Sequence, residues 1–462
     1  MKNSPEFGRG AVAGFRSRRR RVDAAALFGG EPPALLFDDE QMVLKNISAS
    51  GSGAFASDRD TGDDALEVSR LGVLRLMQHG EEIFCGAARI ARTENQSGGT
   101  FAGLALESDE FDLADLQRRN FAAIMRALPG AQAQSLTQGD NGFLRADRKP
   151  SESLFGFENL NAELDRVSER FSRGDIIGGM ADGREVLLKA RADFGPRWRD
   201  EAVDEIRRHE LATFAHRCPL TRRSFNRPRG YPGDAPLLDQ IYGLGEAVLW
   251  PHPATIGGQV SFFVVHSSAC WAVRLRREIL AREIDRTCAG VEGGARILSV
   301  ACGHLRELEL AERVRDGGLK TFYALDQDGE SIKEVRDSFP DLPIETVEGS
   351  VRGIISKKTT FEDIDFAYAA GLLDYLVAPV AMRLIERMFS FLKPGGCLLV
   401  ANFTPAGEDI GYMEAFMDWW LIYRTSDELR ELLSGLPGDE VANIEIYEDM
   451  RGVVTYAVVE KA

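Results

Sequence analysis

Short apolar segments alternate with amphipathic segments through the last third of the chain. The apolar segments are residues 296–300, 321–325, 344–347, 366–370 and 397–403. Each has the length of a buried strand, and the segments 305–314, 329–339 and 379–392 between them show helical spacing. Parallel strands need helical crossovers, so this alternation predicts a parallel α/β sheet wound on both faces. Ligands on such sheets bind at the carboxyl ends of the strands.

The turns that follow these strands resemble those of class I S-adenosylmethionine-dependent methyltransferases, which have a Rossmann-like fold. A glycine-containing turn follows the first strand, an acid ends the second, and Leu-Lys-Pro-Gly-Gly precedes the fifth. The resemblance implies that the first turn passes the methionine part of the cofactor and that Asp326 accepts from the ribose hydroxyls. It also implies that residues 350–352 read the adenine edge and that the fourth strand ends beside the transferred methyl. The cofactor-binding candidates are Ala301, Cys302, Gly303, Asp326, Gln327, Ser350, Val351, Arg352, Gly371 and Leu372.

The first of these turns departs from the family pattern. Three glycines are usual there, whereas Ala301 and Leu305 take the outer places and only Gly303 is kept. The G-x-G-x-x-G pattern of dinucleotide sites is absent, and Cys302 and His304 crowd the position that a pyrophosphate would approach. A dehydrogenase is therefore disfavoured. A degenerate pocket that no longer binds the cofactor stays open as an alternative.

The region 154–290 shows helical spacing and is expected to cap the sheet. Arg-Pro-Arg-Gly-Tyr-Pro-Gly-Asp at 227–234 interrupts it, because its prolines and glycines exclude a helix interior. This segment, His-Ser-Ser at 266–268 and Asp-Trp-Trp-Leu-Ile-Tyr-Arg at 418–424 are similar to bacterial methyltransferases that form 3-hydroxypalmitic acid methyl ester. The resemblance covers residues 155–462 and implies a carboxylic or lipid-like acceptor and an O-methyl ester product.

Five residues are the catalytic candidates. An acceptor carboxylate is already ionised at neutral pH, so its methylation depends on positioning, which an arginine clamp can provide. Arg274 and Arg424 are the candidates for that clamp, and Tyr231 and Tyr375 are candidates to hydrogen-bond the acceptor. His266 is the candidate base if the acceptor is a hydroxyl or an amine.

A second type of pattern occupies residues 15–110. Short segments with turn signals predict a small β-barrel, with strands at 35–37, 42–47, 65–68, 72–77, 83–91 and 100–106 and a turn at 50–53. An R-x-x-x-R arm at 16–20 and an N-x-S-x-x-G motif at 46–51 resemble the signatures of PilZ domains, the bacterial receptors for cyclic di-GMP. Guanidinium groups suit this ligand because they pair with phosphate and with guanine edges. The cyclic di-GMP candidates are Arg16, Arg19, Arg20, Arg21, Asn46, Ser48 and Gly51, with the arginine register left open.

Charge and cysteine spacing narrow the choice of partners and compartment. The 56 basic and 72 acidic residues give a formal net charge of −16, which opposes binding to nucleic acid or to an anionic membrane. No apolar run has the length of a membrane span. The six cysteines form no C-x-x-C pair, so we expect no metal site and a reducing cytoplasm. A homodimer is compatible with the sequence.

Together these observations predict a multidomain protein. Its expected divisions are a flexible N-terminus (1–14), a PilZ-like barrel (15–110), a helix and linker (111–153), a helical cap (154–290) and a methyltransferase domain (291–462). The predicted function is a cyclic di-GMP-responsive methyltransferase that uses S-adenosylmethionine on a small acceptor. The alternative is a cyclic di-GMP receptor whose methyltransferase fold serves only as a scaffold.

Overall fold

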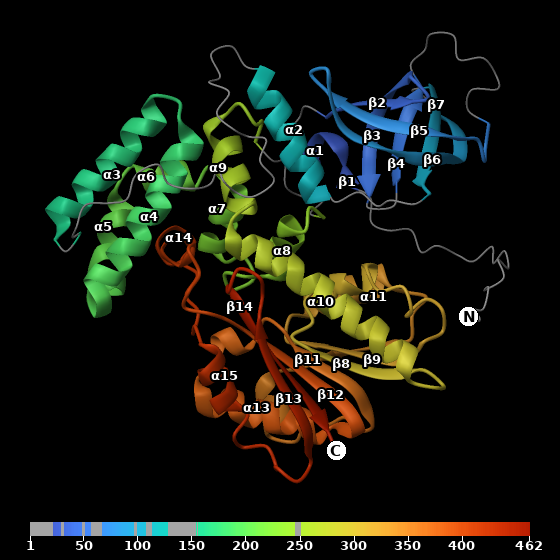
Figure 1. Cartoon of the computed structure of the whole chain (residues 1–462), viewed down its shortest axis with the longest axis vertical. Helices are drawn as coiled ribbons and strands as arrows, with labels where there is room; N and C mark the ends of the chain where they lie inside the picture. Colours follow the sequence, from blue (N-terminus) through green and yellow to red (C-terminus); the bar gives the residue numbers. More distant parts are fainter. Residues whose placement is uncertain are drawn as a thin grey trace, which may run out of the picture.

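The computed structural model describes residues 22–28, 32–48, 51–56, 67–96, 99–107, 113–127, 154, 156–244 and 251–462. These residues form a closed β-barrel, a helical middle and a C-terminal α/β unit (Figure 1). The barrel and the α/β sheet lie at opposite ends of the molecule, and the helices of residues 157–226 lie to one side. The predicted multidomain organisation is therefore confirmed.

The barrel consists of six antiparallel strands, and a seventh, very short strand pairs with one of them. The strands are β1 (Val22–Asp23), β2 (Ala34–Phe37), β3 (Glu40–Ser48), β4 (Gly51–Ala56), β5 (Leu71–Gln78), β6 (Glu81–Gln96) and β7 (Gly99–Leu106). The order β3-β2-β5-β6-β7-β4 closes because β4 also pairs with β3, while β1 pairs with β3 at one end. Alternate side chains such as Leu35, Leu74 and Ile90 fill the interior. Helices α1 (Ala24–Leu27) and α2 (Leu113–Ala127) contribute to the same core.

Two predictions in the barrel are wrong. Residues 51–53, expected within a turn, begin strand β4, where small residues pack closely against β7. A Cβ on Gly51 would lie 2.1 Å from the carbonyl oxygen of Leu104, so glycine is required there by strand packing. The strand expected at 65–68 is not formed at Glu67 and Val68, and residues 65–66 lie outside the described part of the chain.

The helical middle is more finely divided than its periodicity predicts. Its helices are α3 (Phe157–Ser172), α4 (Ile176–Phe194), α5 (Val203–Arg208), α6 (Leu211–Ala215), α7 (Pro219–Asn226), α8 (Ala235–Ile241), α9 (Ile256–Val265) and α10 (Ser268–Gly290). Residues 198–215 are not one continuous helix but a π-turn, Trp198–Ala202, followed by α5 and α6. The linker expected at 131–153 lies outside the described residues.

The chain is not continuously helical between α9 and α10, because it breaks at His266 and Ser267. The hydroxyl of Ser267 accepts a hydrogen bond from the backbone N–H of Cys270 at 3.4 Å, so it caps α10 and starts a new helix axis. The bend between α9 and α10 is 49°. No single helix among the described segments is long and apolar enough to cross a bilayer, and α9 with α10 meets that measure only as a bent pair.

The C-terminal unit is a seven-stranded mixed sheet. Its strands are β8 (Ala295–Val300), β9 (Leu319–Asp326), β10 (Ile344–Glu348), β11 (Ile364–Ala369), β12 (Leu392–Phe403), β13 (Val441–Glu448) and β14 (Val454–Lys461). Its helices are α11 (Gly329–Ser338), α12 (Val351–Ile355), α13 (Ala378–Ser390), α14 (Ile410–Phe416) and α15 (Ser426–Leu432). The strand order is β10-β9-β8-β11-β12-β14-β13.

Helices cover both faces of this sheet. Ile297 and Phe366 share one core with α10 and α11, whereas Leu298 and Ala367 share another with α12, α13 and α15. Alternation along β8 and β11 thus sends successive side chains to opposite layers. The first five strands, β8 to β12, are parallel as predicted.

Two features of this unit differ from the prediction. The sheet is not wholly parallel, because β13 and β14 form an antiparallel hairpin on β12. The helix expected at 305–314 is reduced to the 3₁₀ turn Arg306–Glu309. Leu305 has a left-handed backbone (φ 55°), which cannot belong to an α-helix, and the side chain of Arg306 is held by the cap.

Candidate functional site

A cavity of about 550 Å³ lies where strands β8, β9, β10 and β11 end. Its other walls come from α8, α10, the segment around Tyr231 and the segment around Trp419. Its size is within the range of small-molecule sites. All ten cofactor-binding candidates line it, namely Ala301, Cys302, Gly303, Asp326, Gln327, Ser350, Val351, Arg352, Gly371 and Leu372.

The turn after β8 has the backbone of a glycine loop although it holds one glycine. Ala301, Gly303 and Leu305 all have positive φ, at 58°, 55° and 55°. Such a conformation costs a non-glycine residue roughly 1–2 kcal/mol. Leu305 is 1% exposed, so its buried side chain offsets that cost. Two of the three positions with positive φ in this loop are therefore held by residues other than glycine.

Asp326, at the end of β9, fastens this loop. Its Oδ2 accepts from the N–H of Gly303 at 2.8 Å, and its Oδ1 accepts from the N–H of Asp328 at 2.9 Å. The N–H of Gly349 donates to its backbone oxygen at 2.8 Å, which joins the end of β10 to the same point. Burial raises the pKa of Asp326 although these N–H groups favour its ionised form.

The segment between α7 and α8 closes the cavity from the cap side. Arg229 reaches across to Asp328 and Ser331, at 2.7 and 3.1 Å. Tyr231 lines the cavity, and burial together with the nearby carboxylates of Asp326 and Asp328 raises its pKa. Tyr231 is therefore a neutral hydrogen-bonding group at physiological pH.

Two aromatic side chains meet on the same wall. The indole Nε1 of Trp419 donates to the hydroxyl of Tyr375 at 2.8 Å, and both residues line the cavity. A Cβ on Gly233 would lie 2.4 Å from the Trp419 ring, so this glycine leaves room for the indole. Tyr375 is thereby oriented as a hydrogen-bonding group whose pKa burial raises.

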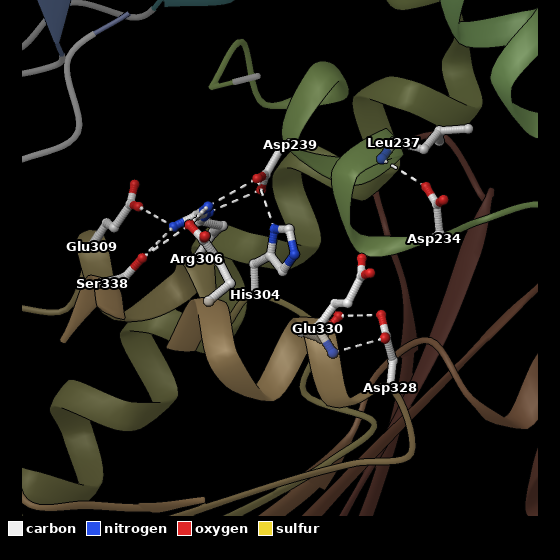
Figure 2. Close-up of polar contacts among 12 residues, drawn as sticks. Asp234, Leu237, Asp239, His304, Arg306, Glu309, Asp328, Glu330 and Ser338 are labelled. Carbon is white, nitrogen blue, oxygen red and sulfur yellow. Dashed lines mark hydrogen bonds and ion pairs between the residues drawn. The ribbon is translucent and has the colours of Figure 1, made fainter. Parts of the chain in front are cut away.

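A buried ionic cluster joins α8 to the loop after β8 (Figure 2). Asp239 accepts from Nδ1 of His304 at 2.8 Å and, through both oxygens, from Arg306 at 2.9 Å. Arg306, 2% exposed, also contacts Glu309 and Ser338. Burial alone would raise the pKa of Asp239, but the hydrogen bonds from Arg306 and His304 lower it well below its ordinary value. The cap and the loop after β8 are thus held together by this cluster.

Three of the five catalytic candidates lie away from this cavity. His266 lines a separate, small hollow between α2 and α9, and its Nδ1 lies 2.8 Å from the carbonyl oxygen of Phe262. Arg274 donates to the carbonyl oxygens of Ile241 and Val265. Arg424 donates to the carbonyl oxygens of residues 373 and 376 and to the side chain of residue 402. The structure brings together Tyr231 and Tyr375 but not these three.

Sequence reasoning missed Arg276, an arginine of α10 that lines the cavity. It lies on α10 between Val273 and Leu280, which also line the cavity, so a cation stands in the apolar stripe at i, i+3 and i+7. That spacing was the available signal. Glu307 lines the same wall, accepts from the hydroxyl of Tyr368 at 2.5 Å, and has a pKa raised by burial.

The cyclic di-GMP candidates fall partly outside the structure. Arg16, Arg19, Arg20 and Arg21 lie outside the described residues. Asn46 and Ser48 lie on β3 opposite β4, and the hydroxyl of Ser48 donates to the carbonyl oxygen of Gly51 at 3.3 Å.

Comparison with known proteins gives distant structural likenesses only. No known protein family and no curated protein matches the sequence. The chain is similar to a possible exported protein from Bordetella parapertussis (19% identity, TM-score 0.38, 44% of this chain and 72% of that one). It is also similar to the N-methyltransferase NodS from Bradyrhizobium japonicum with S-adenosylhomocysteine (14%, 0.31, 42% and 93%). A third is magnesium protoporphyrin IX methyltransferase from Synechocystis with bound S-adenosylmethionine (11%, 0.31, 42% and 84%). Methyltransferases are thus among the solved structures that this chain resembles, over less than half of its length.

Proposed function

We propose that the chain is a methyltransferase that uses S-adenosylmethionine. One observation carries the proposal: the residues chosen from four successive strand ends line a single cavity. Loop 301–305 keeps a glycine-type backbone, and Asp326 presents a buried carboxylate at the end of β9. These features fit the cofactor, which supplies an electrophilic methyl group when bound.

The acceptor we propose is a small carboxylic or lipid-like molecule, methylated on oxygen. The cavity wall includes the apolar side chains of Val273, Leu280, Phe403 and Leu421, which suit an acyl chain. A carboxylate needs no base at neutral pH, and His266, the candidate base, lies in another hollow. Tyr231 and Tyr375 position the acceptor by hydrogen bonds, which favours an in-line displacement.

Calorimetric titration of the full chain with S-adenosylmethionine tests the cofactor assignment. We expect micromolar binding that Asp326→Ala abolishes, because the ribose-binding carboxylate and the anchor of Gly303 are both lost. Asp316→Ala is the matched control, since Asp316 is exposed and lies in a turn before β9. Absence of binding to the wild type would favour the alternative, a receptor with a scaffold of methyltransferase type.

We further propose that the barrel binds cyclic di-GMP and regulates the cavity. The closed barrel with Asn46 and Ser48 near the end of β3 supports this assignment. A route to the cap exists, because Phe121 of α2 stacks on Phe262 of α9 with ring centroids 3.8 Å apart. Titration with cyclic di-GMP is expected to show binding that Arg20→Ala weakens and that the exposed control Arg173→Ala leaves unchanged. Identical methyl-transfer rates with and without the nucleotide would remove the regulatory role.

A further inference from the structure

Arg276 is a buried cation that faces the cavity without a protein partner. Its side chain is 8% exposed, and no hydrogen bond or ion pair joins it to any of the described residues. Nη1 and Nη2 lie 3.4 and 3.3 Å from where a Cβ on Gly371 would stand. The absence of a side chain at Gly371 therefore leaves room for the guanidinium at the end of β11.

The neighbouring arginines of α10 show what a satisfied guanidinium looks like in this environment. Arg274 donates to two backbone carbonyls, and Arg277 donates to the carbonyl oxygen of Arg306 and to Glu309, both at 3.0 Å. Arg276 stands between them in sequence and lines the cavity, as Arg277 does, but no acceptor among the described residues meets its guanidinium. The fold therefore supplies acceptors to Arg274 and Arg277 but none to Arg276.

A buried guanidinium without acceptors is costly, because its five N–H groups lose water and gain nothing in return. A planar anion that accepts two parallel hydrogen bonds removes that cost. We propose that Arg276 binds a carboxylate group of the ligand held in the cavity. It would then fill the carboxylate-binding role for which the sequence suggested Arg274 or Arg424. The choice of ligand rests on the proposed function; the anchor itself rests on the geometry of Arg276.

The surroundings favour a singly charged carboxylate over a phosphate. Asp374 and Glu307 are close enough for their ionisation to be coupled to the charge of Arg276, although neither forms an ion pair with it. Where these carboxyl groups are ionised, they repel a doubly charged ligand more strongly than a singly charged one. The apolar wall formed by Val273 and Leu280 beside the guanidinium further suits an organic acid.

Two ligands can supply the carboxylate: the acceptor, or the amino-acid part of the cofactor. The experiment measures the affinity of the full chain for four probes: S-adenosylhomocysteine, 5′-methylthioadenosine, octanoate and octanamide. The first pair differs in the amino-acid group, and the second pair differs in the charge. Octanoate and octanamide are titrated into protein saturated with S-adenosylhomocysteine. The variants are Arg276→Gln, Arg276→Lys and the control Arg286→Gln, an exposed position on the same helix.

If the acceptor is the source, the wild type binds octanoate at least 10-fold more tightly than octanamide. Arg276→Gln then abolishes this preference while its affinity for S-adenosylhomocysteine stays unchanged. If the cofactor is the source, the preference for S-adenosylhomocysteine over 5′-methylthioadenosine falls at least 10-fold in Arg276→Gln. Arg276→Lys keeps the charge but not the fork, so it restores part of either preference.

A wild type without either preference would overturn the proposal, and this measurement needs no variant to fold. Preferences equal in wild type and Arg276→Gln would overturn it as well. Failure of the proposed function has a different signature. The wild type would bind neither adenosine compound, while an Arg276-dependent preference for octanoate, titrated without nucleoside, would leave the carboxylate anchor standing.

Discussion

The backbone N–H of Gly303 donates a hydrogen bond of 2.8 Å to Oδ2 of Asp326. This contact fixes the turn after β8 to the end of β9, the two places where the proposed cofactor binds. A residue expected only to contact ligand therefore also shapes the loop beside it. Loss of the carboxylate should affect binding through both roles.

Asp326→Asn tests that double role. The amide keeps one acceptor oxygen, but its NH₂ group faces either the N–H of Gly303 or that of Asp328. Loss of a charge-assisted bond costs about 1.5–3 kcal/mol. We expect affinity for S-adenosylmethionine to fall by about 10- to 100-fold in calorimetry. Unchanged affinity would remove Asp326 from the cofactor site.

Ala301→Gly is expected to stabilise the protein, because the left-handed backbone at residue 301 strains a non-glycine residue. After the entropy cost of the added glycine, the expected gain in unfolding free energy is about 0.5–1 kcal/mol. Gly303→Ala, at φ 55°, should shift it by about the same amount in the other direction. Urea unfolding measures both, and a loss of stability in Ala301→Gly would contradict the assigned strain.

Leu305→Gly has the opposite expected sign to Ala301→Gly although both relieve a positive φ. The side chain of Leu305 is buried, and deleting a buried leucine side chain costs about 2–5 kcal/mol, more than the strain it relieves. Thermal unfolding should show a clear fall in Tm. A rise would mean that Leu305 does not hold the loop by packing.

Asp239→Asn should uncouple the cap from the cofactor loop. It leaves the guanidinium of Arg306 buried with its main acceptor weakened, which costs about 3–5 kcal/mol for a buried pair. We expect urea unfolding to show a lower unfolding free energy for Asp239→Asn than for the wild type. The control Asp316→Asn should have the unfolding free energy of the wild type. Equal stability of the two variants would show that the cluster is not required.

Stability should depend on the ionisation of Asp374. Burial raises the pKa of Asp374 to about 6. The hydrogen bond that its Oδ1 accepts from the N–H of Phe403 and the charges of Arg276 and Arg424 act in the opposite direction. A folded-state pKa above the unfolded value gives stability that is present at low pH and is lost as pH rises through about 6. Relative to Asp374→Asn, the wild type should lose about 1–2 kcal/mol between pH 5 and pH 7.5. Parallel pH profiles of the two proteins would contradict the raised pKa.

The parallel strands were predictable because each is a continuous apolar run between turn residues, as in residues 296–300. The final hairpin was not, because β13 lies at the sheet edge and mixes exposed and half-buried positions. The helix expected at 305–314 failed for a reason outside its own sequence. Asp239, more than sixty residues earlier, holds Arg306 in a turn.

The candidate site divides in the same way. Residues at strand ends could be placed from sequence, since parallel topology brings such ends to one edge. The sequence could not show which arginine of α10 lines the cavity, because that depends on which face of the helix meets the sheet. Arg274 and Arg276 are two positions apart, so they point in different directions, and only the packing of α10 shows which one faces the cavity.

The stacked rings of Phe121 and Phe262 have a consequence for the proposed coupling between the barrel and the cap. The residues around this contact include the apolar side chains of Phe28, Pro251 and Val265. Dissolved salt screens charges but leaves ring contacts intact. In the regulation proposed above, coupling of the barrel to the cap through this junction would depend on ring packing, and we expect it to persist at ionic strengths that screen an ion pair.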